Sequence, residues 1–528
     1  MPTTDSKISQ NTDELISEGL RLRQHLGLNA AIKLFQQAAQ SDPNSSLPLQ
    51  MLGNAATELG DYDGAVEYYE RARDIQPKNH VIRYNLGLSQ LSRGYIDLAI
   101  GELAGACYLN PSYACAQSAF IMALHYSDRV TPEEIVSSIR EWGTRFVAQH
   151  PPTNVAGQNQ GVSGRKPRVG FVSGDFRTHS VAHFFEPIAS ARNRNKFEYI
   201  FYSNSGRQDA VTERLRACAD IWRDVSDLED EKLVELIHSD RIDILVDLSG
   251  HTEGNRLAIF ALRAAPIQVT YLGFPNSTGL PTIDFRITDA MTDPLFAEGW
   301  STERLLRLPD TQWCFRPFGS PARPGPLPAR EAGFITFGSF NSLTKVSDTL
   351  LGAWGKILTK LPTSHLRLTR VQSPKRAAEI VEYLNKCGVS AKRIECMPYR
   401  REVPYGLQYS GVDIALDPFP YNGVTTTCES LYVGVPTISL YGRNCVSRSG
   451  LSILSALGLR ELAASSCEQY VDIAIALAGD LQRLETLRAG LRDRFEQSPL
   501  RNEKEFAKHF EELLHSAWRS HLAESKRS

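Results

Sequence analysis

The first third of the chain repeats a pattern of small, apolar and helix-ending residues every 34 positions. Four sets of residues share this spacing: Gly19, Gly53 and Gly87; Ala31, Ala65 and Ala99; Ala38, Ala72 and Ala106; and Pro43, Pro77 and Pro111. Small residues at fixed places let two helices pack closely, and a proline after the second helix ends it. The pattern therefore predicts helical hairpins over about residues 12 to 113 that bury their faces on neighbouring hairpins.

This spacing resembles the tetratricopeptide repeat, and a further helical stretch extends to about residue 149. We expect an α-solenoid over residues 12–149, with a concave surface of the kind that binds peptides or proteins. Chance spacing of Ala and Pro is the alternative, and four sets with one period argue against it. Residues 150–167 are rich in Gly, Pro and small polar residues and are typical of a linker.

Short apolar runs alternate with helical stretches after residue 167, which predicts parallel sheets. Strands are expected at residues 168–173, 243–248, 268–272 and 285–288, and then, after a Pro-rich stretch, at 334–338, 364–369, 393–397, 412–416 and 435–440. Two such series indicate two doubly wound, Rossmann-like α/β lobes, over residues 168–330 and 331–522, with a cleft between them. Ligands of such folds bind at the carboxyl ends of the strands.

Composition adds few constraints. A chain of 528 residues is too long for one core, and its net charge of −2 argues against binding of nucleic acid through phosphate contacts. There is no apolar run of about 18 residues and no apolar signal-peptide core. The nine cysteines are scattered without a C-x-x-C pair, so we expect a reduced, cytoplasmic protein.

Residues 417–436 contain the most informative local pattern, an apolar strand end, a glycine turn, three threonines and the start of a helix. Backbone N–H groups at a helix start favour anions, so Gly423, Thr425, Thr426 and Thr427 are expected to hold a diphosphate. Glu429 lies one helical turn after Thr425 and could accept hydrogen bonds from a ribose diol. An ordinary capped helix is the alternative.

Other candidates follow the ends of predicted strands. Lys345 comes just after the strand at 334–338, where a fixed cation could neutralise a diphosphate leaving group. The loop with Pro275, Asn276, Thr278 and Gly279 follows another strand and could offer backbone N–H groups to a sugar or phosphate. A solvated lysine and an ordinary turn are the alternatives.

Three histidines are candidates for catalysis or substrate orientation. His179 follows the first strand of the first lobe and His251 follows a later one, whereas His238 lies on a predicted helix. A structural role is the alternative for each. No G-x-G-x-x-G, phosphate-loop or H-E-x-x-H motif is present, which favours a metal-independent reaction that uses a nucleotide.

Together these motifs resemble the O-GlcNAc transferase/SPINDLY family, and the SPINDLY branch most closely. The resemblance covers nearly the whole chain and is carried by residues 178–181, 249–252, 274–284, 337–341 and 425–432. It implies a tetratricopeptide superhelix joined to a two-lobed GT-B glycosyltransferase. It also implies inverting, metal-free transfer of one sugar from a nucleotide sugar to Ser or Thr of proteins that the repeats recruit, with no other cofactor.

The resemblance also assigns roles to residues. Lys345 matches the lysine that supports the leaving diphosphate, Thr425 and Thr426 match the pair at the diphosphate, and Glu429 matches the acidic residue at the ribose. His179 matches a cleft histidine and His238 a second one, while the loop from Pro275 to Gly279 matches a loop that borders the sugar.

Two differences bear on the donor. Val424 replaces a histidine of the animal enzymes, and their base-contacting histidine has no counterpart near Gly406. Both differences weaken the case for UDP-GlcNAc, and the SPINDLY branch implies GDP-fucose; both donors remain open. The other readings are a tetratricopeptide scaffold with an inactive nucleotide-binding half, and an enzyme that glycosylates asparagine or a small molecule.

Overall fold

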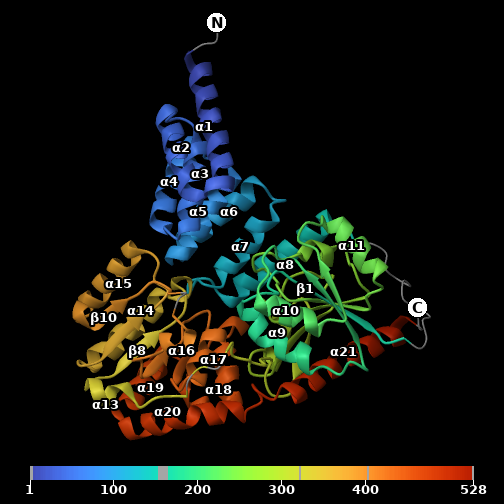
Figure 1. Ribbon diagram of the computed structural model, residues 1–528. Helices are drawn as coiled ribbons and strands as arrows, with labels where there is room; N and C mark the ends of the chain where they lie inside the picture. The colour runs from blue at the N-terminus through green and yellow to red at the C-terminus, as the bar shows by residue number, and fades with distance from the viewer. Residues whose placement is uncertain (1–3, 153–164, 320, 322, 401–402, 526–528) are drawn as a thin grey trace. The chain divides into compact units, whose positions relative to one another are not determined.

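The computed structural model describes residues 4–152, 165–319, 321, 323–400 and 403–525 (Figure 1). Most of the predicted linker therefore lies outside the described residues. The chain divides into two compact units: one takes in the chain up to Ser127 together with Ser342–Val346 and Leu368–Arg400, and the other takes in the rest.

The repeats form antiparallel helices joined by short turns. They are α1 (Thr4–Leu26), α2 (Leu28–Ser41), α3 (Ser46–Leu59), α4 (Tyr62–Ile75), α5 (His80–Arg93), α6 (Ile96–Leu109) and α7 (Ala114–Leu124). The periodic alanines are fully buried. A Cβ on Gly53 would lie 2.6 Å from the ring of Tyr69, and one on Gly87 would lie 2.7 Å from Leu103. The glycine period therefore arises because each first helix touches a large side chain of the second, and the helical hairpins are confirmed.

The first lobe is built on a seven-stranded parallel sheet in the order β3-β2-β1-β4-β5-β6-β7. The strands are β1 (Arg168–Ser173), β2 (Glu198–Ser203), β3 (Ile221–Asp224), β4 (Ile244–Asp247), β5 (Ile267–Thr270), β6 (Phe285–Asp289) and β7 (Arg304–Leu308). Its helices are α9 (Ser180–Ala191), α10 (Ala210–Cys218), α11 (Asp230–Ser239) and α12 (Leu257–Ala261), with η1 (Leu295–Trp300) before β7.

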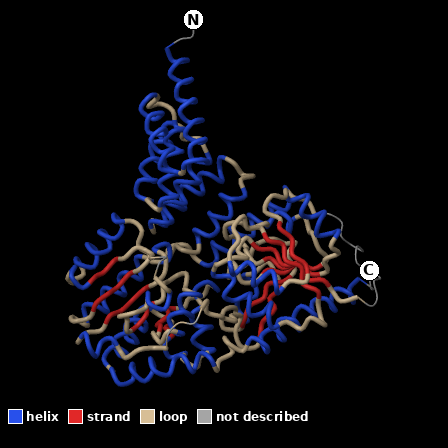
Figure 2. Tube along the Cα trace, viewed as in Figure 1, coloured by secondary structure: helices blue, strands red, loops and turns tan. Residues whose placement is uncertain are grey.

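The second lobe contains a sheet in the order β10-β9-β8-β11-β12-β13. Its strands are β8 (Thr336–Ser339), β9 (His365–Leu368), β10 (Ile394–Cys396), β11 (Ile414–Leu416), β12 (Thr437–Leu440) and β13 (Ala463–Ala464). Figure 2 shows the strands gathered in two separate sheets, each with helices around it. The expected solenoid followed by two Rossmann-like lobes is thus confirmed.

Helices and short 3₁₀ turns complete the second lobe. They are α13 (Pro328–Ala332), η2 (Leu343–Lys345), α14 (Asp348–Lys360), α15 (Pro374–Lys386), η3 (Ala391–Arg393), α16 (Tyr405–Gln408), α17 (Thr425–Tyr432), η4 (Cys445–Ser447), α18 (Ser449–Ala456), η5 (Arg460–Leu462), α19 (Cys467–Gly479) and α20 (Leu481–Glu496).

Two helices belong to other parts of the molecule than the expected domain boundaries place them in. The stretch up to residue 149 contains α8 (Pro132–Gln149), which groups with the lobes, and Trp142 of α8 packs edge-on against His251 at 4.6 Å. The last helix, α21 (Glu503–Ser525), returns to the first lobe beside α9 (Figure 1). There Glu511 accepts a hydrogen bond from the backbone N–H of Asn193 at 2.6 Å. α8 directly precedes the first lobe in sequence, whereas α21 lies far from it along the chain.

Candidate functional site

The loop between β11 and α17 is organised by a buried carboxylate. Asp417 is only 2% exposed, and one of its oxygens accepts hydrogen bonds from the backbone N–H of Gly423 at 2.9 Å and the hydroxyl of Thr427 at 3.1 Å. Its other oxygen accepts from the hydroxyl of Ser439 at 2.6 Å. The expected strand, glycine turn and helix start are all present, and Asp417 fixes the turn that leads into α17.

The start of α17 has the features of an anion site. Val424 occupies the cap position without a side-chain hydrogen bond to the helix, and the first turn has no acidic residue. The first N–H groups of a helix have no acceptor within it, and its dipole favours negative charge there. Thr425 and Thr426 are half-buried, and the hydroxyl of Thr426 donates to Asn341 at 3.0 Å. Asn341 follows β8, so the ends of two neighbouring strands meet at this helix start.

The three threonines are not equivalent. Thr427 is buried, and its hydroxyl donates to Asp417 and to the carbonyl oxygen of Gly423, both at 3.1 Å. A Cβ on Gly423 would lie 2.4 Å from the hydroxyl of Thr426, so only glycine fits the turn. Thr427 and Gly423 therefore shape the loop, and direct contact of either with a donor remains a prediction.

Glu429 lies one turn into α17, as the spacing predicts. One of its carboxylate oxygens accepts a hydrogen bond from the hydroxyl of Tyr409 at 3.1 Å. The same hydroxyl lies 3.2 Å from the carbonyl oxygen of Thr426, and Tyr409 is 3% exposed. Tyr409, which the sequence did not single out, thus orients the carboxylate. The ribose contact of Glu429 remains a prediction.

Lys345 is the last residue of η2 and is half-buried. The hydroxyl of Ser342 accepts the backbone N–H of Thr344 at 3.3 Å, which closes the turn. Along the chain, Lys345 lies four residues after Asn341. Its contact with a diphosphate remains a prediction.

His179 caps the start of α9 directly after β1. Its Nδ1 accepts the backbone N–H of Val181 at 3.3 Å, so the neutral ring carries its proton on Nε2. A carboxylate oxygen of Asp175 lies 3.3 Å from the same Nδ1. Burial, with a smaller contribution from the charge of Arg177, lowers the pKa of His179 to about 4. Burial also raises the pKa of Asp175 to about 6.

This geometry favours an orienting role for His179 over a basic one. A ring that accepts through Nδ1 presents an N–H at Nε2, which can donate to a hydroxyl or phosphate oxygen. The contact with Asp175 is favourable when either partner is protonated. Asp175 was not predicted; the only sequence signal is its position four residues before the histidine.

The loop after β5 is held by a second buried carboxylate. Glu303, 3% exposed, accepts hydrogen bonds from the hydroxyl of Ser277 at 2.7 Å and the backbone N–H of Thr278 at 2.8 Å. The backbone carbonyl of Thr278 lies 2.9 Å from Nε2 of His251, which is 2% exposed. Thr278 and His251 are therefore parts of one rigid corner.

Neighbouring residues of that loop also have structural contacts. Asn276 is 5% exposed, and its side-chain amide lies 3.5 Å from Asn444, which belongs to the second lobe. Gly279 has φ of 81°, and a Cβ on it would lie 2.5 Å from Ile139 of α8. Donor contacts of Pro275, Asn276, Thr278, Gly279 and His251 remain predictions.

His238 lies apart from His179 in the first sheet. It is in the last turn of α11, before β4 begins, whereas His179 follows the carboxyl end of β1. β1 and β4 are parallel neighbours, so the two histidines lie at opposite edges of the sheet. Burial lowers the pKa of His238. The topology argues against a shared catalytic site, and we leave His238 out of the chemistry proposed below.

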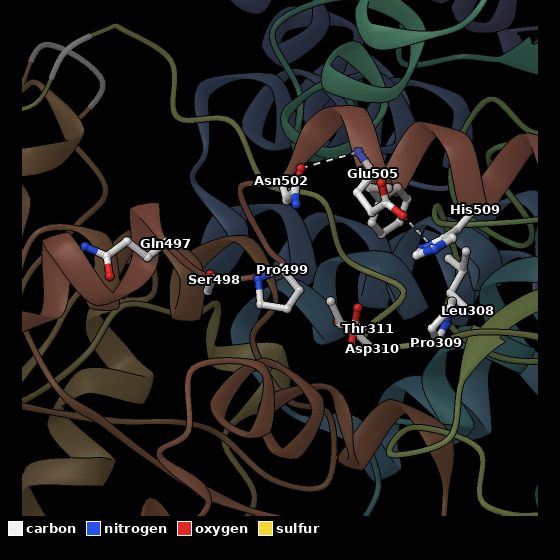
Figure 3. A pocket seen from close by; sticks show the side chains of 11 residues that line it. Leu308, Pro309, Asp310, Thr311, Gln497, Ser498, Pro499, Asn502, Glu505 and His509 are labelled. Atoms are coloured by element: carbon white, nitrogen blue, oxygen red, sulfur yellow. Dashed lines mark hydrogen bonds and ion pairs between the residues drawn. The ribbon is translucent and has the colours of Figure 1, made fainter.

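A small pocket of about 140 Å³ lies where α20 and α21 meet the end of β7 (Figure 3). Figure 3 shows Asn502, Glu505 and His509 along one side of it. A carboxylate oxygen of Glu505 lies 3.2 Å from Nε2 of His509. None of the predicted site residues lines this pocket. Within the described ranges, no three His, Cys, Asp or Glu side chains come together as metal ligands. No helix in the part of the chain that the structure describes is both long enough and apolar enough to span a bilayer.

Comparisons with known proteins agree with this architecture. Residues 145–315 and 327–510 match the model of glycosyl transferase family 41, and residues 53–94 match a TPR repeat. The chain belongs to glycosyl transferase family 41. The resemblance drawn from the motifs is thereby confirmed.

Two similar proteins of known name come from plants. The chain is 38% identical over 411 residues to a Solanum lycopersicum protein named "Probable UDP-N-acetylglucosamine--peptide N-acetylglucosaminyltransferase SPINDLY", which covers 76% of this chain and 44% of that one. It is also 30% identical over 374 residues to an Arabidopsis thaliana protein named "Probable UDP-N-acetylglucosamine--peptide N-acetylglucosaminyltransferase SEC". That match covers 68% of this chain and 38% of the relative. The chain thus spans less than half the length of these relatives.

A solved structure matches over its full length. This is a single-substitution mutant of the Thermobaculum terrenum O-GlcNAc transferase, with a TM-score of 0.87, 34% identity and 99% coverage of both chains. Both the repeats and the two lobes therefore have counterparts in one solved protein.

Proposed function

We propose that this protein transfers one sugar from a nucleotide sugar to Ser or Thr hydroxyls of other proteins. The observation that carries the proposal is the start of α17, where Asp417 fixes the turn, Asn341 binds Thr426 and no acidic side chain opposes an anion. Such a helix start at the carboxyl ends of parallel strands suits a diphosphate. Membership of family 41 and the full-length match to an O-GlcNAc transferase support the reaction class.

In the proposed reaction, the acceptor oxygen attacks the anomeric carbon and forms the new glycosidic bond. The bond from that carbon to the diphosphate breaks on the opposite face, which inverts the configuration. The nucleoside diphosphate leaves with the bonding electrons, and the acceptor proton passes to a base that is not assigned. The N–H groups at the start of α17 and the hydroxyl of Thr425 stabilise the departing charge. Lys345 is assigned to the same charge by resemblance, and no divalent metal ion is required.

The donor is proposed to be UDP-GlcNAc or GDP-fucose. The plant relatives have UDP-N-acetylglucosamine in their names. Val424 stands where the animal enzymes have a histidine, and this difference favours GDP-fucose. Acceptors are proposed to be proteins that bind the concave surface of the repeats.

A donor screen tests the proposal. Thermal unfolding and hydrolysis are measured with UDP-GlcNAc, UDP-glucose, GDP-fucose, UDP and GDP. A ligand present at 100 times its Kd stabilises the folded state by about 2.7 kcal/mol and raises the melting temperature. We expect stabilisation and turnover with UDP-GlcNAc or GDP-fucose, and loss of stabilisation in Thr425→Val. Stabilisation without turnover would favour an inactive scaffold, and no stabilisation by any of the five compounds would contradict the proposed function.

A further inference from the structure

The turn that carries Lys345 packs against the end of a repeat helix. Thr344 Oγ1 donates a hydrogen bond to the carbonyl oxygen of Leu91 at 3.0 Å, and that oxygen also accepts the backbone N–H of Gly94 at 2.9 Å. Leu91 is in the last turn of α5, where carbonyls have no donor within the helix. Thr344, the residue before Lys345, is therefore hydrogen-bonded to the carbonyl of Leu91 at the end of α5.

Gly94 lies directly against this turn. It ends α5 with φ of 82°, and a Cβ on it would lie 2.9 Å from the carbonyl oxygen of Leu343. Gly60 ends α3 with nearly the same geometry, φ of 78°, yet a Cβ there would meet nothing within 4 Å. The hairpin itself therefore does not require the close approach at Gly94. The contact of α5 with η2 requires it, because a side chain at position 94 would meet Leu343.

A second set of contacts holds α15 to the same repeats. Asp63 of α4 pairs with Arg93 of α5 at 2.7 Å and accepts the hydroxyl of Ser373 at 2.8 Å. Arg93 is 5% exposed and Ser373 is fully buried. The hydroxyl of Tyr95 donates to Glu379 of α15 at 2.6 Å. Two successive repeats thus bind the segment that follows β9.

The division of the chain agrees with these contacts. Ser342–Val346 and Leu368–Arg400 group with the repeats, whereas Asn341 and Ser347–Arg367 group with the lobes. The five-residue Lys345 turn (Ser342–Val346) is therefore part of the repeat unit by its packing, although the chain on both sides of it belongs to the lobes.

We propose that the α5–α6 turn of the repeats positions Lys345 for the reaction. This inference rests on the proposed function, in which Lys345 neutralises the leaving diphosphate. Gly94 and Thr344 are positioning residues that act through the backbone of η2. Lysine has a long, flexible side chain, so a defined place for its ammonium group requires a fixed backbone. A displacement of about 1 Å costs on the order of 100-fold in rate.

Gly94→Ala and its matched control, Gly60→Ala, test the proposal. Both put alanine at a positive φ and share the same backbone strain, and only the first presses on Leu343. We expect kcat to fall by roughly 10- to 100-fold in Gly94→Ala, with a smaller change in the Kd of the nucleoside diphosphate, and to stay near wild type in Gly60→Ala. Equal kcat values in the two variants would overturn the proposal.

Thr344→Val and Thr344→Ser provide an independent pair if Gly94→Ala does not fold. Valine removes the hydroxyl without changing the size of the side chain, and serine keeps it. Hydrogen exchange over residues 336–350 should become faster in Thr344→Val and stay unchanged in Thr344→Ser, with kcat following the same order. Unchanged exchange in Thr344→Val would overturn the support by α5, and faster exchange with unchanged kcat would overturn the positioning of Lys345.

Hydrogen exchange also separates the two proposals. If the wild-type protein turned over none of the donors, the proposed function would fail. The exchange difference between Thr344→Val and Thr344→Ser would still report whether α5 holds the Lys345 turn. A protein that is active and shows the exchange difference but no difference in kcat would keep the proposed function and lose this inference.

Discussion

Replacing Asp417 by alanine should loosen the loop that presents the start of α17. The carboxylate accepts hydrogen bonds from the N–H of Gly423 and the hydroxyls of Thr427 and Ser439. Thr427 has a second acceptor, the carbonyl oxygen of Gly423 at 3.1 Å. The change to alanine therefore leaves two buried donors without an acceptor, the N–H of Gly423 and the hydroxyl of Ser439.

The expected magnitude follows from these two donors. Each buried donor left unpaired costs about 1–3 kcal/mol, so the pair gives roughly 2–6 kcal/mol. Removal of a buried charge offsets part of this cost, because a carboxylate is unfavourable away from water. We expect the free energy of opening the loop to fall by about 3 kcal/mol, which corresponds to roughly 100-fold faster hydrogen exchange.

The assay is hydrogen exchange followed by mass spectrometry on peptides that cover residues 412–432. A local measurement is needed because a chain with several domains has no single free energy of unfolding. Asp417→Asn is the control. It keeps an oxygen that can accept the N–H of Gly423, so exchange should rise only about tenfold. Exchange in Asp417→Ala that matched the wild type would refute the reasoning.

Three other predictions concern the proposed chemistry. Lys345→Ala should lower kcat on the order of 10²- to 10³-fold with little change in donor binding, while Lys360→Ala at the exposed end of α14 should leave both unchanged; equal turnover would remove Lys345 from the reaction. EDTA should leave turnover intact, and a strict need for a divalent ion would contradict the mechanism. His179 should titrate with a pKa of about 4 and carry its proton on Nε2 above that pH. NMR of labelled histidine measures both, with the signal assigned by its loss in His179→Gln, and a pKa near 6.5 would show that burial does not act as described.

Local pattern was enough to predict much of the fold. The 34-residue period gave the helical hairpins, and apolar runs bounded by turn residues gave β8 to β12. Four strands were not predicted: β2, β3, β7 and β13. β2 is a buried interior strand, and β13 has only two residues. β3 and β7 lie at the edges of their sheet and are partly exposed. Polar residues interrupt their apolar runs, so β7, with the sequence Arg-Leu-Leu-Arg-Leu, carries no clear strand signal.

The candidate site was predictable only in part. The four-residue spacing of Thr425 and Glu429 predicted one shared helix face, and the predicted helix start included Thr426. Contact of these residues with a donor remains a prediction. Glu303 was missed because it binds Thr278 from 25 positions away, and nothing in the local sequence connects them. Tyr409 and Asp175 were missed for similar reasons. Side chains that orient others are recognised from tertiary contacts, which a single sequence does not display.

Asp63, which pairs with Arg93 and accepts a hydrogen bond from Ser373, limits how such a repeat array can change in length. Repeat arrays commonly lengthen by duplicating a whole unit, since each unit contacts only its neighbours. Here Arg93 of one unit and Ser373 of α15 both bind the carboxylate of Asp63, which belongs to the preceding unit. A 34-residue insertion between α4 and α5 would carry Asp63 away from Arg93, whereas new units placed before α1 would leave both side chains where they are. Growth before α1 therefore keeps the junction of the array to α15, whereas an insertion between α4 and α5 does not.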